Sequence, residues 1–373
     1  MNTDRYTTSL LIGIGLLLLT VASTNYIIDP ANIYGSGEDE DNSPEAYATQ
    51  LIQSEHGLLW PNDSWSERDI KRNLASKIKD ADCSIIGSSR VMQISSLLEQ
   101  PCFPELSNSI VNLGVSGATL EDYLALSWEL LQNPEHPRKI IFGIDPWALD
   151  WNQDSRWASY KDAYTSMRNL LSKESPSTDT GNTSTALKSL KNLINFEYFN
   201  RSLSMIGATT HRITAAPPHD INLGIEHPIF RPDGSLVYSE EYIQTTSAPD
   251  YVITPGDYKI KEYGAITSDS AVKTFTSLIK HLQEEGIEVH FVLIPYHISL
   301  WKTPNSRTVS VITEAEEIIT QLSINLNVPL WGSYNPTIVG CDETDYYDYM
   351  HPNTEALIMI KQIQRSTNHT LEN

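Results

Sequence analysis

Two residues near the C-terminus have the types and spacing of a general base and the acid that orients it. Asp348 stands three positions before His351. At that spacing the carboxylate can accept a hydrogen bond from the imidazole Nδ1–H, which leaves the other ring nitrogen to take a proton from a serine. The pair therefore predicts acyl-transfer chemistry if folding brings a serine hydroxyl to the imidazole.

The serine candidate is Ser89, in the segment Gly87–Arg90. An apolar strand pattern ends at Gly87, and apolar residues recur at helical spacing between Val91 and Leu98. A strand that turns into a helix there presents the hydroxyl at the carboxyl edge of a parallel sheet. Helix N-terminal amides beside it can stabilise an oxyanion.

Two further segments have the same strand-then-glycine pattern. Ile110–Thr119 contains Asn112, Gly114 and Gly117, and a periodic helical pattern follows it. Ile140–Trp147 ends in a turn that contains Asp145. In a parallel sheet, the polar residues of all three loops lie along one edge.

The order of these blocks resembles the SGNH (GDSL-like) hydrolase superfamily over roughly residues 83–151 and 270–365. In that family Ser89 takes the place of the nucleophile, although Ser88 replaces the usual Asp. Asn112 and Gly117 match the second block, and Asp348 and His351 match the last. The resemblance implies a Ser-His-Asp triad that needs no metal or organic cofactor, with the amides of Ser89 and Gly117 as the oxyanion hole.

The third block departs from the family pattern. Asp145 occupies the position of the oxyanion-hole asparagine, where an ionised carboxylate would repel a developing oxyanion. Three readings remain open: burial keeps Asp145 protonated, the side chain points away and serves substrate binding or structure, or the hydrolase is weakened or lost. We favour the second. Arg90 either pairs with an acid such as Asp145 or binds an anionic substrate.

Polar residues also follow a later strand pattern, Val289–Ile294. Tyr296 and His297 come directly after it and form either a wall of the substrate cleft or a polar loop. The candidates for substrate contact are therefore Arg90, Asn112, Asp145, Tyr296 and His297.

The elements that must position these residues alternate between strand and helix patterns. Such alternation predicts an α/β fold, with a three-layer parallel sheet flanked by helices over residues 71–150 and 270–373. Residues 151–269 interrupt it with helical stretches, a Ser/Thr-rich segment over 172–185 and a turn signal at 231–238. We interpret 151–269 as an insertion or cap over the active-site edge.

The N-terminus contains one long apolar stretch, Thr7–Ile28, with no charged residue between Arg5 and Asp29. At about 1.5 Å per residue it can cross a hydrocarbon layer of about 30 Å. We favour an uncleaved anchor with residues 1–6 in the cytoplasm and 29–70 as a tether and lead-in. A signal peptide cleaved near Val21–Thr24 is the alternative. The flanking charges place the rest of the chain outside the cytoplasm.

Composition excludes one class of partner and leaves the cysteines open. There are 26 basic and 47 acidic residues, for a formal charge of −21, which argues against nucleic-acid binding. Cys83, Cys102 and Cys341 lack metal-ligand spacing. They form either one disulfide, with Cys102–Cys341 preferred, or buried free thiols.

The resemblance also implies a cellular role. An anchored member of this superfamily is similar to the extracytoplasmic partners of multi-spanning membrane O-acyltransferases, which acetylate exopolysaccharide. We therefore expect an acyltransferase acting on a polysaccharide, as a membrane protein facing the periplasm or cell surface. An esterase with the same triad and a non-catalytic scaffold or glycan-binding protein are the alternatives.

Overall fold

The computed structural model describes residues 3–28, 43–60, 65–151, 156–172, 193–194, 199, 202–203, 213–218, 226–246, 267–302 and 306–361. The chain divides into two compact units. One contains residues 1–47, 61–66 and 172–213, and the other contains residues 48–60, 67–171 and 214–373. All the candidate site residues belong to the second unit, which we call the α/β unit.

The α/β unit is built on a five-stranded sheet in the order β3-β2-β4-β7-β8, with every neighbouring pair parallel. The strands are β2 (Cys83–Gly87), β3 (Ile110–Asn112), β4 (Lys139–Gly143), β7 (Glu288–Leu293) and β8 (Leu330–Gly332). The described helices are α1 (Thr3–Ile28), α2 (Pro44–Gln53), α3 (Glu67–Lys77), α4 (Leu120–Gln132), α5 (Lys161–Leu171), α8 (Glu240–Thr246), α9 (Asp269–Glu284), α10 (Arg307–Leu326), α11 (Pro336–Val339) and α12 (Thr354–Ile358). The predicted α/β class and parallel sheet are confirmed.

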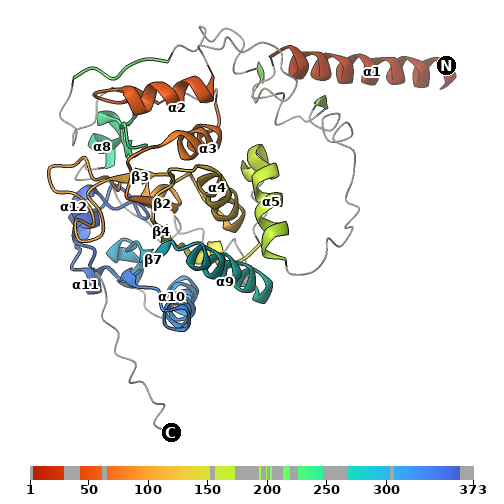
Figure 1. Cartoon of the computed structure of the whole chain (residues 1–373). Helices are drawn as coiled ribbons and strands as arrows, with labels where there is room; N and C mark the ends of the chain where they lie inside the picture. The colour runs from red at the N-terminus through yellow and green to blue at the C-terminus, as the bar shows by residue number, and fades with distance from the viewer. Residues whose placement is uncertain are drawn as a thin grey trace. The chain divides into compact units, whose positions relative to one another are not determined.

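Alternation of apolar residues along the strands separates the two faces of the sheet. Phe142 of β4 and Phe291 of β7 face a large core shared with α3, α4, α5, α9 and α10. Ile141 and Val292, their neighbours in sequence, face a second core formed by residues 91–103 and α12. Strands buried on both faces read as continuous apolar runs, as these do. Figure 1 shows α4 and α9 on one side of the strands and α12 on the other.

Local sequence signals set several helix boundaries. Ser268 caps α9 by accepting the Ala271 N–H at 3.2 Å, and Ser306 caps α10 in the same way through Val309. The Asp122 carboxylate accepts the Thr119 N–H at 2.7 Å at the start of α4. These are the helices predicted from the periodic patterns.

The prediction of a helix after Ser89 was wrong. The structure has only the 3-10 turn η2 (Ser89–Val91), followed by irregular chain as far as β3. The reason is Asn112, whose side-chain amide donates to the carbonyl oxygens of Val91, Met92 and Ile94 at 2.8–3.2 Å. Carbonyl groups bound in this way do not extend a helical ladder.

The described parts of residues 151–269, the predicted insertion, pack in two different places. Helix α5 packs against α4 in the main core, so it supports the sheet and is not part of a cap. Strands β5 (Ile229–Phe230) and β6 (Leu236–Val237) form the predicted hairpin and pair with β1 (Leu58–Leu59) in a small antiparallel sheet. Gly234 has φ +81° in its turn. Residues 173–185 of the Ser/Thr-rich segment lie outside the described residues.

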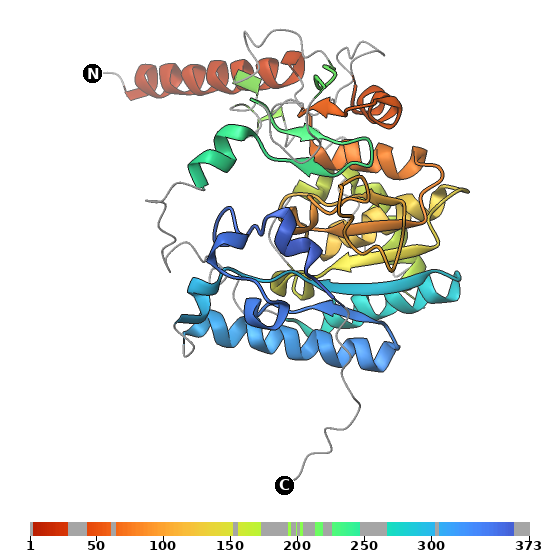
Figure 2. The same ribbon diagram turned by 90° about the vertical axis from the view of Figure 1, so that its left-hand side faces the viewer.

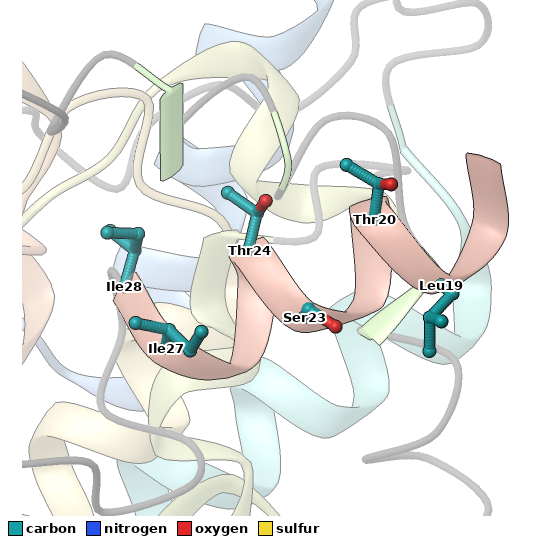
Figure 3. Close-up of a pocket in the computed structure, with 6 residues that line it drawn as sticks. All are labelled: Leu19, Thr20, Ser23, Thr24, Ile27 and Ile28. Carbon is teal, nitrogen blue, oxygen red and sulfur yellow. The ribbon is translucent and has the colours of Figure 1, made fainter. Parts of the chain in front are cut away.

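The other unit contains α1. Its residues Thr7–Ile28 form one helix long and apolar enough to cross a membrane. The large apolar side chains of residues 10–19 are 45–63% exposed, which leaves a continuous apolar surface. A hollow of about 450 Å³ lies along this helix, lined by Leu19, Thr20, Ser23, Thr24, Ile27 and Ile28 (Figure 3). Every lining residue belongs to the apolar helix, so the hollow is unrelated to the candidate triad. Of the predicted tether and lead-in at residues 29–70, residues 29–42 and 61–64 lie outside the described part of the chain.

Candidate active site

The structure brings the three predicted triad residues into one hydrogen-bonded chain. The Ser89 Oγ lies 2.8 Å from the His351 Nε2, and the His351 Nδ1 lies 2.7 Å from the Asp348 Oδ2. These contacts join residues 262 positions apart in sequence. The arrangement lets His351 accept the Ser89 proton through one ring nitrogen while Asp348 holds the other.

Ser89 is placed by the close approach of its own turn to the sheet. A Cβ on Gly143 would lie 2.2 Å from the Val91 Cγ1, and one on Gly87 would lie 2.8 Å from the Val91 Cγ2. The two glycines therefore let Val91 sit directly on the ends of β2 and β4. The Ser88 Oγ accepts the Arg90 N–H and closes the turn. The Ser89 side chain remains partly exposed, as a nucleophile must.

The loop that holds His351 is fixed mainly by Asp348. The Asp348 Oδ1 accepts the backbone N–H groups of Met350 and His351, each at 2.7 Å. Burial by itself raises the pKa of Asp348, but hydrogen bonds from His351, Tyr242 and Met350, with the charge of the imidazolium, lower the pKa to about 2. Asp348 is therefore ionised at neutral pH and ready to orient the imidazole.

Arg90 connects the loop of the imidazole to the ends of the sheet. Its Nη1 binds the Asp145 carboxylate at 2.7 Å, its Nε donates to the Met350 carbonyl oxygen at 3.1 Å, and its Nη2 donates to the Ile294 carbonyl oxygen. The guanidinium carbon lies 3.7 Å from the centre of the Tyr296 ring. Both charged side chains are buried, so the structure assigns Arg90 and Asp145 to the scaffold of the site and not to its surface.

The ion pair also explains how a carboxylate can stand at position 145, where the resemblance predicts an asparagine. A guanidinium 2.7 Å from the carboxylate neutralises its charge locally. Of the readings open from the sequence, the observed one is that Asp145 points to an internal partner and serves structure.

The predicted oxyanion loop lies beside the nucleophile turn. The Val115 N–H donates to the Gly87 carbonyl oxygen at 2.9 Å, which sets residues 113–117 against the end of β2. Gly117 has φ +59°. Within the described residues, the amides of Ser89 and Gly117 donate to no other protein group. Both amides are available to a substrate oxygen, as an oxyanion hole requires.

A largely buried carboxylate, its side chain 10% exposed, also holds this loop. Glu67, in the first turn of α3, accepts the Ser116 N–H at 2.5 Å and the Ser116 hydroxyl at 3.2 Å. Burial raises the pKa of Glu67, against the opposing effects of Arg68 and these hydrogen bonds. No spacing in the sequence connects Glu67 to Ser116, and this contact was missed.

Asn112 is positioned for structure and not for substrate. It is fully buried, it donates to three backbone carbonyl oxygens, and its Oδ1 accepts the Gly114 N–H at 2.9 Å. The two N–H bonds of the amide are shared among the three carbonyl oxygens, so both donors are used. Its contribution to the site is to hold the turn after Ser89 against the oxyanion loop.

Tyr296 and His297 follow β7 at the same sheet edge. Tyr296 is fully buried beneath Arg90, so it packs within the scaffold. His297 is 7% exposed, and its Nδ1 accepts the Ser299 N–H at 3.1 Å. Burial lowers the pKa of His297, outweighing the effect of Glu343. Of the two sequence readings, the structure favours a structural loop for this pair.

Two tyrosines of the hairpin region also reach the triad. The Tyr242 hydroxyl donates to the Asp348 Oδ2 at 2.7 Å, and the Tyr238 ring lies edge-on to the His351 ring with centroids 6.0 Å apart. Sequence reasoning missed both. Their only signal was aromatic content after the predicted turn at residues 231–238, which does not identify a partner.

Metal and disulfide chemistry have few candidates. Among the described residues, no group of three His, Cys, Asp or Glu side chains is arranged to hold a metal ion. Cys83, Cys102 and Cys341 are all buried free thiols, so the preferred Cys102–Cys341 disulfide is absent and the alternative holds. Burial raises the pKa of the Cys102 thiol to about 11, which keeps it unreactive at neutral pH.

Comparisons with known proteins add no family. The chain matches no protein-family model and no curated protein.

Proposed function

We propose that this protein is an SGNH-like acyltransferase that uses Ser89, His351 and Asp348 to transfer an acyl group, most simply acetyl, to a cell-envelope polysaccharide or exopolysaccharide. The observation that carries the proposal is the hydrogen-bonded chain from the Ser89 Oγ through His351 to Asp348, at 2.8 and 2.7 Å. The partial exposure of Ser89, and the absence of a protein acceptor for the Ser89 and Gly117 amides within the described residues, support the same proposal.

The reaction has two half-reactions. The Ser89 Oγ forms a bond to the acyl carbonyl carbon while His351 Nε2 takes its proton, and the amides of Ser89 and Gly117 bind the oxyanion. The intermediate collapses as the donor's oxygen leaves with that proton, giving an acyl-serine. A sugar hydroxyl then attacks the ester, His351 takes the hydroxyl proton, and Ser89 leaves with the proton returned.

The order of the sequence blocks supports a likeness to the SGNH superfamily at the level of the site. Each block follows a strand of the parallel sheet, apart from the Asp348–His351 block, which follows β8 after a longer connection. The pairing of Asp145 with Arg90 removes the main chemical objection to that likeness.

The proposed location is the extracytoplasmic face of a membrane, with α1 as an uncleaved anchor. Thr7–Ile28 has the required length, and Arg5 precedes it while Asp29 and further acidic residues follow. A multi-spanning membrane O-acyltransferase is the proposed supplier of the acyl group. The charge of −21 supports a neutral or cationic substrate and argues against nucleic acid.

A carbohydrate esterase is the second candidate. It is favoured by the partial exposure of Ser89, which admits water to an acyl-serine as readily as a sugar hydroxyl. The two candidates share every catalytic residue and differ in the acceptor.

The nucleophile is tested by intact-mass analysis of the full chain in detergent after exposure to a serine-directed fluorophosphonate. We expect one adduct on Ser89, none in Ser89→Ala, and labelling slowed about 1,000-fold in His351→Gln. Ser76→Ala, at an exposed serine on α3, is the control and should label like wild type. Absence of the adduct, or labelling independent of His351, would leave only a scaffold or glycan-binding role.

The acceptor is tested with 4-nitrophenyl acetate in the presence and absence of a neutral oligosaccharide. A transferase yields acetylated oligosaccharide, while an esterase yields acetate alone. Formation of acetate without acylated sugar, at every oligosaccharide concentration tried, would favour the second candidate.

A further inference from the structure

The region around α8 contributes to the candidate triad from outside the sheet. We propose that Tyr242 is a positioning residue that holds Asp348 in the orientation that His351 needs, and that the hairpin β5–β6 with α8 is an integral part of the active site. This inference rests on the proposed function for its catalytic consequence, although its structural content can be tested alone.

The first step is the geometry at Asp348. Its Oδ2 accepts two hydrogen bonds of 2.7 Å, one from the His351 Nδ1–H and one from the Tyr242 hydroxyl. The Oδ1 is held by two backbone amides of its own loop. Tyr242 is thus the only donor to this carboxylate, among the described residues, that comes from another part of the chain. A neutral phenol at that point restrains the carboxylate without adding charge to the site.

The second step is what holds Tyr242 in place. The Ser239 Oγ accepts the Tyr242 N–H at 3.2 Å at the start of α8, which fixes the first turn. The Tyr242 ring packs on Tyr238 with centroids 4.7 Å apart and edge-on to Tyr347 at 6.1 Å. Tyr238 in turn lies against the His351 ring. The phenol therefore reaches Asp348 from a packed aromatic cluster.

The third step is the anchorage of the hairpin to the nucleophile side. The Leu236 N–H donates to the Met92 carbonyl oxygen at 2.7 Å, three residues after Ser89. The Asp233 carbonyl oxygen accepts the Asn112 N–H at 2.7 Å, and its carboxylate accepts the Ser95 hydroxyl. The buried Lys71 amine donates to the Gly234 carbonyl oxygen at 2.5 Å.

Residues 229–246 therefore bind both halves of the triad. The hairpin is hydrogen-bonded to the segment that follows Ser89, and α8 is hydrogen-bonded to Asp348. In Figure 2 the green hairpin and α8 lie next to the dark-blue segment that contains residues 348–351. Restraining both loops through one segment reduces the misalignment of Ser89 and His351, to which acyl transfer is sensitive.

The variant Tyr242→Phe removes one hydroxyl and keeps the ring. Tyr347→Phe is the matched control, because its ring packs in the same cluster but its hydroxyl makes no hydrogen bond to Asp348 within the described residues. The full chain is prepared in detergent with 15N-labelled histidine. The His351 signals are assigned by their loss in His351→Gln.

We expect the 15Nδ1 chemical shift of His351 to move in Tyr242→Phe and to stay in Tyr347→Phe, because Oδ2 becomes a stronger acceptor when it loses its second donor. We also expect kcat for 4-nitrophenyl acetate to fall about 10-fold with KM unchanged in Tyr242→Phe. An unmoved His351 shift, or equal movement in both variants, would overturn the inference.

A second measurement does not depend on the stability of Tyr242→Phe. In the chain with the native Tyr242, the 13Cζ resonance of Tyr242 should move when Asp348 is replaced by Asn, and an unmoved resonance would likewise overturn the inference. Failure of the proposed function is a separate result. In that case wild type would neither cleave the ester nor label at Ser89, while both chemical shifts would still move.

Discussion

At the scale of single residues, the site contains two carboxylates with different partners. Asp348 accepts hydrogen bonds from an imidazole, a phenol and two amides, and these lower its pKa to about 2. Asp145 has one buried cation as its partner. We therefore expect both side chains to contribute to the free energy of unfolding. Measurements of unfolding in variants of the two residues can distinguish the contribution of Asp348 from that of Asp145.

The first prediction concerns Asp348 and pH. Its native pKa of about 2 lies below an unfolded value of about 3.9, so its contribution of about 2–3 kcal/mol is complete above about pH 5 and is lost as the pH falls toward 2. We expect the difference in free energy of unfolding between wild type and Asp348→Asn to shrink over that interval. Urea titrations at pH 6, 4 and 3 measure it, and a constant difference would contradict the assignment.

The second prediction concerns the buried ion pair. Asp145→Asn leaves the Arg90 guanidinium buried without its counter-charge and should lower the free energy of unfolding by about 3–5 kcal/mol. Asp162→Asn is the control, because its pair with Arg72 is largely exposed and its loss should cost below about 1 kcal/mol. Similar losses in the two variants, measured by urea unfolding, would show that Asp145 is not essential to the scaffold.

At the scale of elements, the turn after β2 is the decisive piece of local structure. Apolar residues at helical spacing predicted a helix after Ser89. The Asn112 side-chain amide instead donates to three backbone carbonyl oxygens of this segment, and the chain there is irregular. The same side chain holds the start of the oxyanion loop through Gly114. One asparagine on β3 thus sets the shape of both segments that surround Ser89.

The third prediction follows from this role. Asn112→Ala removes three hydrogen bonds to backbone carbonyl oxygens, each contributing about 1 kcal/mol, and should lower the free energy of unfolding by about 3 kcal/mol. It should also slow the labelling of Ser89 by fluorophosphonate under native conditions. Asn325→Ala, at an exposed position of α10, is the control and should change neither quantity. Wild-type stability in Asn112→Ala would contradict the proposed role.

At the scale of the whole molecule, an apolar helix is joined to an acidic α/β unit. The leucines and isoleucines of α1 expose apolar side chains of the kind that face lipid, whereas the chain as a whole carries a formal charge of −21. The apolar helix α1 and the candidate site residues belong to different compact units of the chain.

The fourth prediction concerns the fate of α1. If it is an anchor, the mature protein sediments with membranes, and its intact mass includes Thr7–Ile28. Replacing Leu17 and Leu18 by Arg should then release the chain from the membrane fraction, because charge at the centre of a span costs about 2.5–3.5 kcal/mol per residue. A mature N-terminus near residue 24 would instead establish a cleaved signal peptide.

The sequence by itself determined the parallel strands, the helices α1, α4, α5, α9 and α10, and the hairpin at 231–238, but not the helices α2, α3, α8, α11 and α12. Each predicted element follows from short-range signals, such as apolar periodicity, capping residues and glycine turns, which act within about ten residues. The spacing of Asp348 and His351 and the glycines around Ser89 also identified the candidate triad before any coordinates.

The tertiary structure decided between the two readings of Arg90 and added contacts that the sequence did not predict. The pairs Arg90–Asp145, Glu67–Ser116 and Tyr242–Asp348 join residues 55, 49 and 106 positions apart. Their contacts depend on strand order and loop packing, which no local pattern encodes. The loop after Ser89 shows the same limit, because a side chain on the neighbouring strand outcompetes the helical preference of the segment. Three residues predicted to contact substrate are buried and bind other parts of the protein instead: Asn112, Arg90 and Asp145.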